Sequence, residues 1–129
     1  MFSQKKNEQI FAKRGGVKMT AAMKQTVRVY IANFEGCTGR ASFLLRLARA
    51  FSIDAARIVK GEVWRALCER IATLGASDIP VRVRVVGLDD AYPALSRECE
   101  ALLRILRAAG ERNECFRAEA VIGDMKWKI

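Results

Sequence analysis

Residues 81–85 read Val-Arg-Val-Arg-Val, a strict alternation of branched apolar and cationic side chains. A period of two is typical of a β-strand whose opposite faces meet different surroundings. A strand in a parallel sheet that is covered on both sides would instead read as a continuous apolar run. The sequence therefore predicts a sheet that packs helices on one face and leaves the other face to water or to a partner.

The remaining patterns place three more strands and three helices around this strand. Strands are expected at residues 27–32 and 116–122, and Gly123-Asp124 is expected to turn the chain into a last strand at 125–129. Apolar residues at helical spacing predict one helix from Arg40 and a second from near Ser52 to Gly75. A third helix is expected from Asp89 and Asp90 to Gly110, with Pro93 in its first turn.

This order, β-α-α-β-α-β-β, predicts an α/β fold built as a two-layer sandwich. We expect a mixed sheet of about four strands with the helices on one face. The helix-facing side is expected to hold an apolar set: Val27, Val29, Ile31, Val81, Val83, Val85, Met125, Trp127 and Ile129. The outward side is expected to hold a cationic set with one tyrosine: Arg28, Tyr30, Arg82, Arg84, Arg117, Lys126 and Lys128.

The outward set is the candidate site for nucleic acid or another acidic partner. Its cations can contact phosphates or carboxylates, and Tyr30 offers a ring on which a base can stack. Glu119 is the only acidic residue expected among these cations. The alternative interpretation is a solvated face whose arginines keep an exposed sheet soluble.

A length of 129 residues suits one domain, and the charge divides the chain into two parts. Residues 1–25 hold six Lys or Arg and one Glu, which gives +5 of the net +9. We therefore predict a basic, flexible N-terminal arm over 1–25 and a single α/β domain over 26–129, with Met19 and Met23 as alternative translation starts. The absence of a signal-peptide pattern and of a long apolar run predicts a cytoplasmic protein with no membrane partner.

The residue types that most often carry catalysis are scarce. The chain has no histidine, which excludes Ser-His-Asp and Cys-His catalysis and mixed Cys/His zinc sites. The four cysteines form no Cys-x-x-Cys pair and are expected to be buried free thiols: Cys37, Cys68, Cys99 and Cys115. No nucleophile has an evident base beside it. We therefore predict a protein that is not an enzyme and that uses no metal or cofactor.

Residues 31–42 combine the end of a strand, a turn with two glycines and the start of a helix. This stretch resembles the deviant Walker A phosphate-binding loop of the ParA/MinD family of ATPases. The matching residues are Ala32-Asn33, Gly36, Gly39, Ser42 and the Leu47-Ala48-Arg49-Ala50-Phe51 helix. Residues 85–89, Val-Val-Gly-Leu-Asp, are similar to the family's apolar strand that ends in Asp-x-Asp.

The match departs from the family pattern at several functional positions. Glu35 stands at the signature lysine, Cys37 at the middle glycine and Arg40 at the lysine that contacts phosphate. Gly87 replaces the aspartate that the family uses in hydrolysis. The resemblance thus implies a degenerate nucleotide-binding protein with little or no ATPase activity, whose nucleotide site is formed by Gly36, Gly39, Arg40, Ser42 and Asp89. The alternative is a tight turn that needs glycine for its geometry alone.

Residues 29–34 are also similar to the short RNP motif of RNA-recognition domains, in which an aromatic side chain stacks on a base. Three functions therefore remain as alternatives. The leading hypothesis is a small binding module that uses its outward face on nucleic acid or an acidic protein surface. The second is the degenerate ParA-like nucleotide-binding protein. The third is a homo-oligomer whose sheet faces pair, with acidic residues on the helices meeting the arginines: Glu62, Glu69, Glu98 and Glu100.

Overall fold

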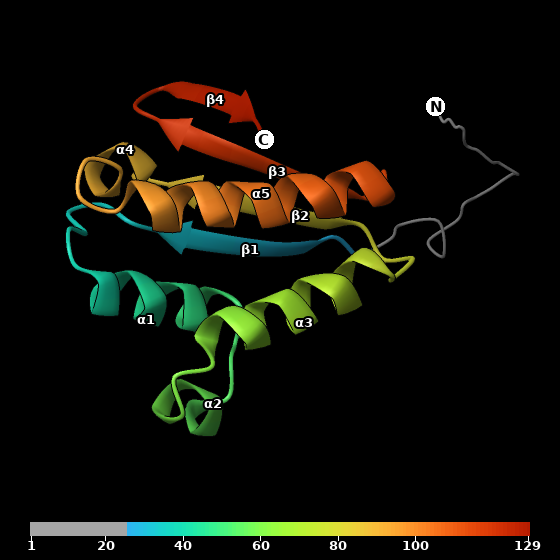
Figure 1. The fold of residues 1–129 in the computed structure, drawn as a ribbon. Helices are drawn as coiled ribbons and strands as arrows, with labels where there is room; N and C mark the ends of the chain where they lie inside the picture. Colours follow the sequence, from blue (N-terminus) through green and yellow to red (C-terminus); the bar gives the residue numbers. More distant parts are fainter. Residues whose placement is uncertain (1–25) are drawn as a thin grey trace, which may run out of the picture.

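The computed structural model describes residues 26–129, so the predicted arm at 1–25 and its two internal methionines lie outside the described residues. Figure 1 shows a four-stranded sheet with its helices gathered on one side. The strands are β1 (Arg28–Asn33), β2 (Val81–Val86), β3 (Phe116–Ile122) and β4 (Met125–Lys128). The helices are α1 (Arg40–Ala50), α2 (Ala55–Val59), α3 (Val63–Gly75), α4 (Leu88–Ala91) and α5 (Ser96–Arg112).

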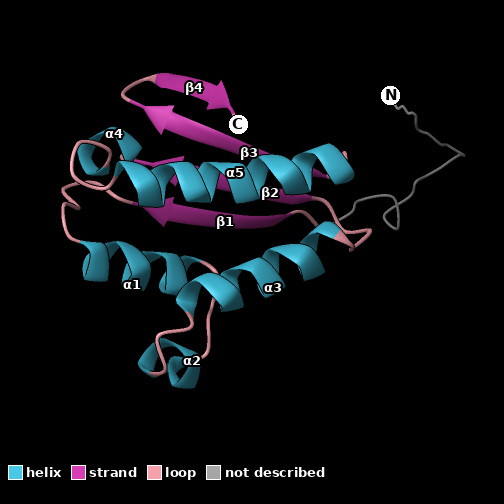
Figure 2. Cartoon of the chain, in the orientation of Figure 1, coloured by secondary structure: helices cyan, strands magenta, loops and turns pink. Residues whose placement is uncertain are grey.

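The strands lie in the sheet in the order in which they occur in the chain. β1, β2 and β3 are parallel neighbours, and β4 returns antiparallel to β3. Figure 2 shows α1, α3 and α5 on the same side of the sheet, with α2 projecting away from the sheet beyond α1 and α3. This arrangement confirms the predicted two-layer α/β sandwich and the predicted element order.

The core lies between β2, the neighbouring strands and the helix layer. Val81, Val83 and Val85 are buried, as their alternation predicted. An apolar stripe along α5 is buried as well: Leu95 just before the helix, and Cys99, Leu102, Leu106 and Ala109 within it. Stacking of the Phe34 and Phe43 rings, whose centroids are 4.3 Å apart, joins the end of β1 to α1. Burial of one apolar stripe from each long element thus holds the two layers together.

Two predicted helices have other bounds in the structure. The helix expected from Ser52 to Gly75 is divided, because Gly61 adopts a left-handed conformation with a φ of +74° between α2 and α3. Asp54 caps α2 by accepting a hydrogen bond from the Ala56 amide at 2.9 Å. Val59, an apolar residue at the end of α2, is 87% exposed. The prediction of one continuous helix is therefore wrong.

The residues between β2 and α5 also differ from the prediction. Asp89 and Asp90 lie within the short helix α4 rather than before a long one, and Pro93 follows α4. The long helix α5 begins at Ser96 and continues two residues past Gly110, to Arg112. These differences change helix bounds and leave the layers unchanged.

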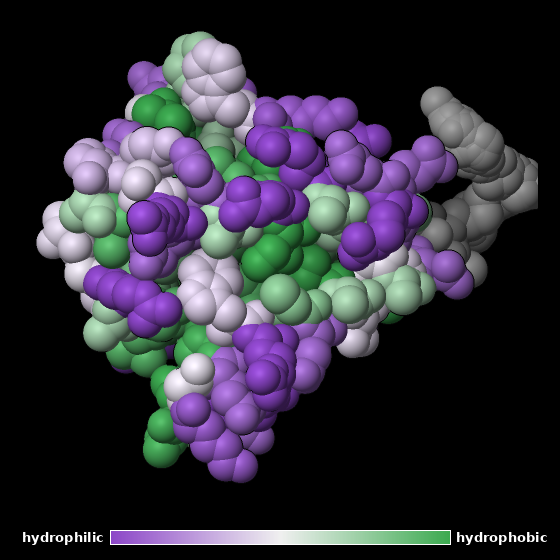
Figure 3. Space-filling model, in the orientation of Figure 1, coloured by the Kyte–Doolittle hydropathy of each residue, from purple (hydrophilic) through white to green (hydrophobic). Residues whose placement is uncertain are grey.

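The helix side of the molecule is largely hydrophilic, with a strip of apolar surface between α5 and the row formed by α1 and α3 (Figure 3). No helix in the described part of the chain is both long enough and apolar enough to cross a bilayer.

Two of the four cysteines are buried, Cys37 and Cys99, whereas Cys68 and Cys115 are exposed. This result differs from the prediction that all four are buried.

Candidate functional site

The uncovered face of the sheet, which we call the open face, brings together five of the predicted cations. The register places Arg82 of β2 beside Arg117 of β3, and Arg84 beside Glu119. On β4, Lys128 lies opposite Glu119, and Lys126 lies opposite Val121. Because side chains alternate along each strand, Arg82, Arg84, Arg117, Lys126 and Lys128 all project from this face.

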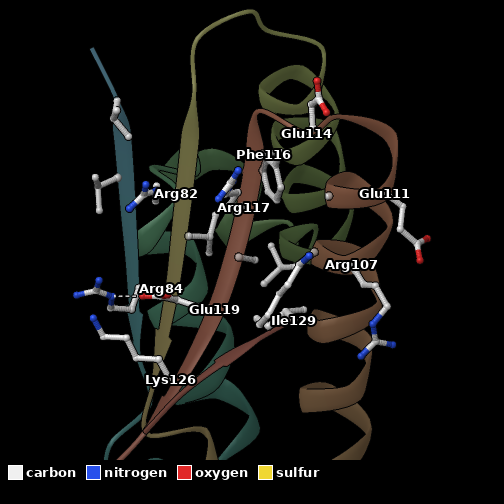
Figure 4. Close-up of a pocket in the computed structure, with 17 residues that line it drawn as sticks. Arg82, Arg84, Arg107, Glu111, Glu114, Phe116, Arg117, Glu119, Lys126 and Ile129 are labelled. Atoms are coloured by element: carbon white, nitrogen blue, oxygen red, sulfur yellow. Dashed lines mark hydrogen bonds and ion pairs between the residues drawn. The ribbon is translucent and has the colours of Figure 1, made fainter. Parts of the chain in front are cut away.

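One of these cations is neutralised within the chain. Arg84 Nε donates to Glu119 Oε2 at 2.8 Å, and both side chains remain partly exposed. Figure 4 shows this pair as a dashed line, with Arg82 and Lys126 on the same side of the sheet. Arg82 and Arg117 have no carboxylate within ion-pair distance among residues 26–129. Like charges placed directly across neighbouring strands repel each other and destabilise the sheet.

Two predicted members of the site lie on the other face, so the prediction for β1 is wrong. Tyr30 pairs in register with the buried Val83, and its ring stacks on Phe51 of α1 with centroids 5.4 Å apart. Arg28 pairs with the buried Val81 and therefore shares the helix side with Tyr30. Among residues 26–129, no aromatic ring therefore lies on the open face, although the predicted base stacking and the similarity to the RNP motif require one.

The residues that replace them on the open face are aliphatic. Val27, Val29 and Ile31 are 44%, 59% and 54% exposed, although all three were predicted to be buried. Sequence reasoning missed them because both alternating sets of this strand are apolar enough for a core. The signal that could have identified the buried set is Phe34, which continues the Tyr30 and Ala32 series and is fully buried.

The predicted core residues on the edge strand β4 are only partly buried. Trp127 lies opposite the buried Ala120, so it points toward the helix layer as predicted. Yet Trp127 and Met125 are 53% and 55% exposed. Ile129, by contrast, is only partly exposed and packs against the core. The two exposed side chains form an apolar border on the helix side of β4.

A hollow of about 1300 Å³ begins on the open face and continues around the end of β3. Its open-face wall includes Arg82, Arg84 and Arg117, and its helix-side wall includes Arg107 and Glu111 of α5. In Figure 4, Arg107 and Glu111 lie on the far side of β3 from Arg82 and Arg84. The hollow therefore joins two surfaces around an edge of the sheet and does not form one enclosed cleft.

The glycine turn between β1 and α1 is occupied by groups of the chain itself. The Gly36 amide donates to Asp90 Oδ2 at 2.8 Å, and the Glu35 amide donates to Asn33 Oδ1 at 2.9 Å. Gly39 is the N-terminal cap residue of α1. Asp90 thus provides, from within the molecule, the negatively charged oxygen that a phosphate would offer to this turn.

The other residues implied by the ParA resemblance lie around the same end of the sheet. Arg40, at the first position of α1, donates through Nε to Glu98 at 3.1 Å. Ser42 is exposed on α1, and Asp89 is exposed on α4. The predicted nucleotide site therefore consists of neighbouring segments, but its cation already has a carboxylate partner.

The acidic helix residues that the homo-oligomer hypothesis requires also have partners in the chain. Arg57 binds both Glu62 and Glu69, at 2.7 Å and 2.8 Å, and its hydrogen bond to Glu69 lowers the pKa of that carboxyl. Glu100 accepts a hydrogen bond from the Tyr92 hydroxyl and thereby raises the tyrosine pKa. These contacts leave less free negative charge for a second open face than the sequence indicated.

The described residues contain no cluster of three or more Cys, Asp or Glu side chains that could hold a metal ion. No family model matches the sequence, and comparisons with curated proteins and with solved structures give no match.

Proposed function

We propose that this chain is a non-enzymatic binding module whose open face holds the phosphate backbone of a nucleic acid. The observation that supports this proposal most strongly is the neighbouring pair Arg82 and Arg117, which has no ion-pair partner within residues 26–129. Lys126 and Lys128 add charge on the same face. Their mutual repulsion is relieved when an anion binds between them, and guanidinium groups bind phosphate oxygens in a bidentate manner.

The composition of the open face indicates what kind of contact it makes. Within the described residues this face carries aliphatic and cationic side chains and Glu119 but no aromatic ring, because Tyr30 packs on the helix side. We therefore expect contacts to the phosphate backbone of the nucleic acid rather than to its bases, and little preference for base sequence. Four cations of this face have no ion-pair partner among residues 26–129. They would neutralise up to about four phosphates, which corresponds to a slope of about −3.6 in a plot of log K against log salt.

Fluorescence anisotropy with a labelled DNA duplex, repeated over a salt series, tests the proposal. We expect binding at low salt that weakens steeply as salt rises, and loss of most of the affinity in the double variant Arg82→Glu/Arg117→Glu. A matched control is Arg97→Glu/Arg104→Glu, which makes the same change in net charge at two exposed positions on α5. Equal losses in the two double variants, or no binding at low salt, would contradict the proposal.

An acidic protein surface is the second candidate partner, and the aliphatic residues of β1 favour it. Val29 lies beside Arg82, and Ile31 lies beside Arg84. An apolar strip next to a cationic one suits a helix that presents leucine and glutamate on one face. A synthetic amphipathic Leu/Glu peptide is the probe. Binding that persists at high salt and is lost in Ile31→Ser would favour this partner over nucleic acid.

Nucleotide binding at the glycine turn stays a prediction of the ParA resemblance. A nucleotide phosphate would have to displace the Asp90 carboxylate from the Gly36 amide. Calorimetry with ATP and ADP tests it, and Asp90→Asn should then strengthen any binding by removing a competing negative charge.

A further inference from the structure

The outer edge of β1 has backbone groups without partners in the described part of the chain. The amides of Arg28 and Phe34 donate to the carbonyls of Pro80 and Val86, at 2.9 Å and 2.7 Å, so these residues direct their backbone groups toward β2. The alternate residues Val29 and Ile31 must then direct theirs away from the sheet. Among residues 26–129, the outward-facing N–H and C=O groups of Val29 and Ile31 make no backbone hydrogen bond.

The unpaired part of the β1 edge ends before Asn33. Asn33 also faces outward, and its carbonyl accepts a hydrogen bond from Arg46 Nη1 of α1 at 3.2 Å. The same nitrogen donates to the Glu35 carbonyl at 2.7 Å, which fixes the Arg46 side chain across the end of the strand. Among residues 26–129, the outward positions without a hydrogen-bond partner are therefore Val27, Val29 and Ile31, a set that is symmetric about Val29.

The two edges of the sheet are protected to different degrees. β4 carries Lys126 and Lys128 among its four residues, and charged side chains of this kind commonly prevent the pairing of edge strands. From Val29 to Asn33, β1 has no charged side chain. Its open-face residues are instead the three exposed aliphatic side chains of Val27, Val29 and Ile31. Among the described residues, the β1 edge thus combines unpaired backbone groups with an apolar surface and lacks the lysines that protect β4.

We propose that the β1 edge pairs antiparallel with β1 of a second copy of this chain, around a two-fold axis at Val29. In an antiparallel ladder, residues whose backbone groups face the partner exchange hydrogen bonds in pairs. Val29 then lies opposite Val29 of the other copy, and Val27 lies opposite Ile31. This register uses every free outward position and none that Arg46 occupies, and it forms up to about six backbone hydrogen bonds.

The side chains are compatible with this register on both faces. A two-fold axis perpendicular to the sheet keeps both open faces on the same side, so the aliphatic residues of the two strands gather at the centre of one continuous sheet. On the helix side, each Arg28 lies opposite Tyr30 of the other copy and not opposite Arg28. That arrangement avoids like-charge repulsion and places a cation beside an aromatic ring. The dimer does not depend on what the open face binds.

Sedimentation equilibrium with a proline substitution tests the dimer. Val29→Pro removes an outward N–H and leaves the hydrogen bonds to β2 in place. A matched control is Lys126→Pro on β4, because the Ile129 amide donates to the Ala118 carbonyl and Lys126 therefore faces outward as well. We expect a dimer for the native chain and for Lys126→Pro, and a monomer for Val29→Pro. A native chain that is monomeric at its highest soluble concentration would overturn the proposal.

Cross-linking tests the register without relying on a disruptive variant. The exposed Cys68 and Cys115 are first changed to serine. Val29→Cys then places two thiols on residues whose Cα atoms are about 5.5 Å apart, within reach of a short bis-thiol reagent. Val27→Cys is the matched control, because in this register residue 27 lies opposite residue 31 of the other copy. The two copies of residue 27 are therefore offset by four residues along the strands, at about 3.4 Å per residue. We expect cross-linked dimer only for Val29→Cys. Equal cross-linking of both variants, or cross-linking of neither, would contradict the proposed interface.

Discussion

Gly87, which directly follows β2, packs closely against the backbone of the β1–α1 turn. Its φ is +73°, and a Cβ atom built there would lie 2.5 Å from the Glu35 amide nitrogen. Gly36 has a similar φ of +70° but no atom within 4 Å of such a Cβ. The two glycines therefore separate the effect of backbone conformation from the effect of close approach.

We predict that Gly87→Ala is much more destabilising than Gly36→Ala. A left-handed conformation at a non-glycine residue costs about 1–2 kcal/mol, which both variants share. Only Gly87→Ala also forces the backbone of β2 away from that of the β1–α1 turn. Urea unfolding of the two variants measures the difference. Equal losses in the free energy of unfolding would show that the close approach of Gly87 to Glu35 is absent.

A second prediction at the residue scale concerns pH. Burial is the main cause that raises the pKa of the Cys99 thiol from 9.0 to about 11. Between these values the unfolded chain loses this proton and the folded chain keeps it, so stability falls as pH rises, by at most about 1.4 kcal/mol per pH unit from this group. We expect Cys99→Ala to reduce the slope of stability against pH between pH 9 and pH 11. An unchanged slope in chemical denaturation would contradict a buried Cys99.

At the scale of elements, the sequence predicted β2 correctly and assigned the faces of β1 wrongly. In β2 one alternating set is valine and the other is mostly arginine, so only one set can be buried. In β1 both sets are largely apolar, and alternation alone cannot choose between them. The choice is made by tertiary packing of Tyr30 and Phe34 against α1. The break at Gly61 escaped prediction for a related reason, since a helical stripe does not reveal a single left-handed residue.

The orientation of β1 leads to a prediction from two neighbouring residues. Tyr30→Ala removes a ring that stacks on Phe51 and is expected to cost about 3 kcal/mol of unfolding free energy. Ile31→Ala removes a side chain that is 54% exposed and should cost less than about 1 kcal/mol. Urea unfolding at a concentration where the chain is monomeric compares them. A larger loss for Ile31→Ala than for Tyr30→Ala would mean that Ile31 faces the helix layer and Tyr30 faces outward.

At the scale of the whole molecule, five of the cations predicted for the outward side lie on one face of the sheet. Arg82, Arg84, Arg117, Lys126 and Lys128 share the open face because the strand order and register set them side by side. The sequence could not show that Arg84 is paired with Glu119, since that contact depends on the register between two distant strands. It also could not show that Asp90 occupies the glycine turn, a contact between residues that are 54 positions apart. Patterns within one strand are local, whereas contacts between strands are not.

The most direct test of the proposed binding face is a nuclear magnetic resonance titration of the labelled protein with a DNA duplex at low salt. We predict that the amide signals that shift most belong to β2, β3 and β4 around Arg82, Arg117, Lys126 and Lys128. Signals of Arg97 and Arg104 on α5 should stay in place. Shifts concentrated on α5, or on the turn from Gly36 to Ser42, would contradict the assignment of the open face as the binding surface.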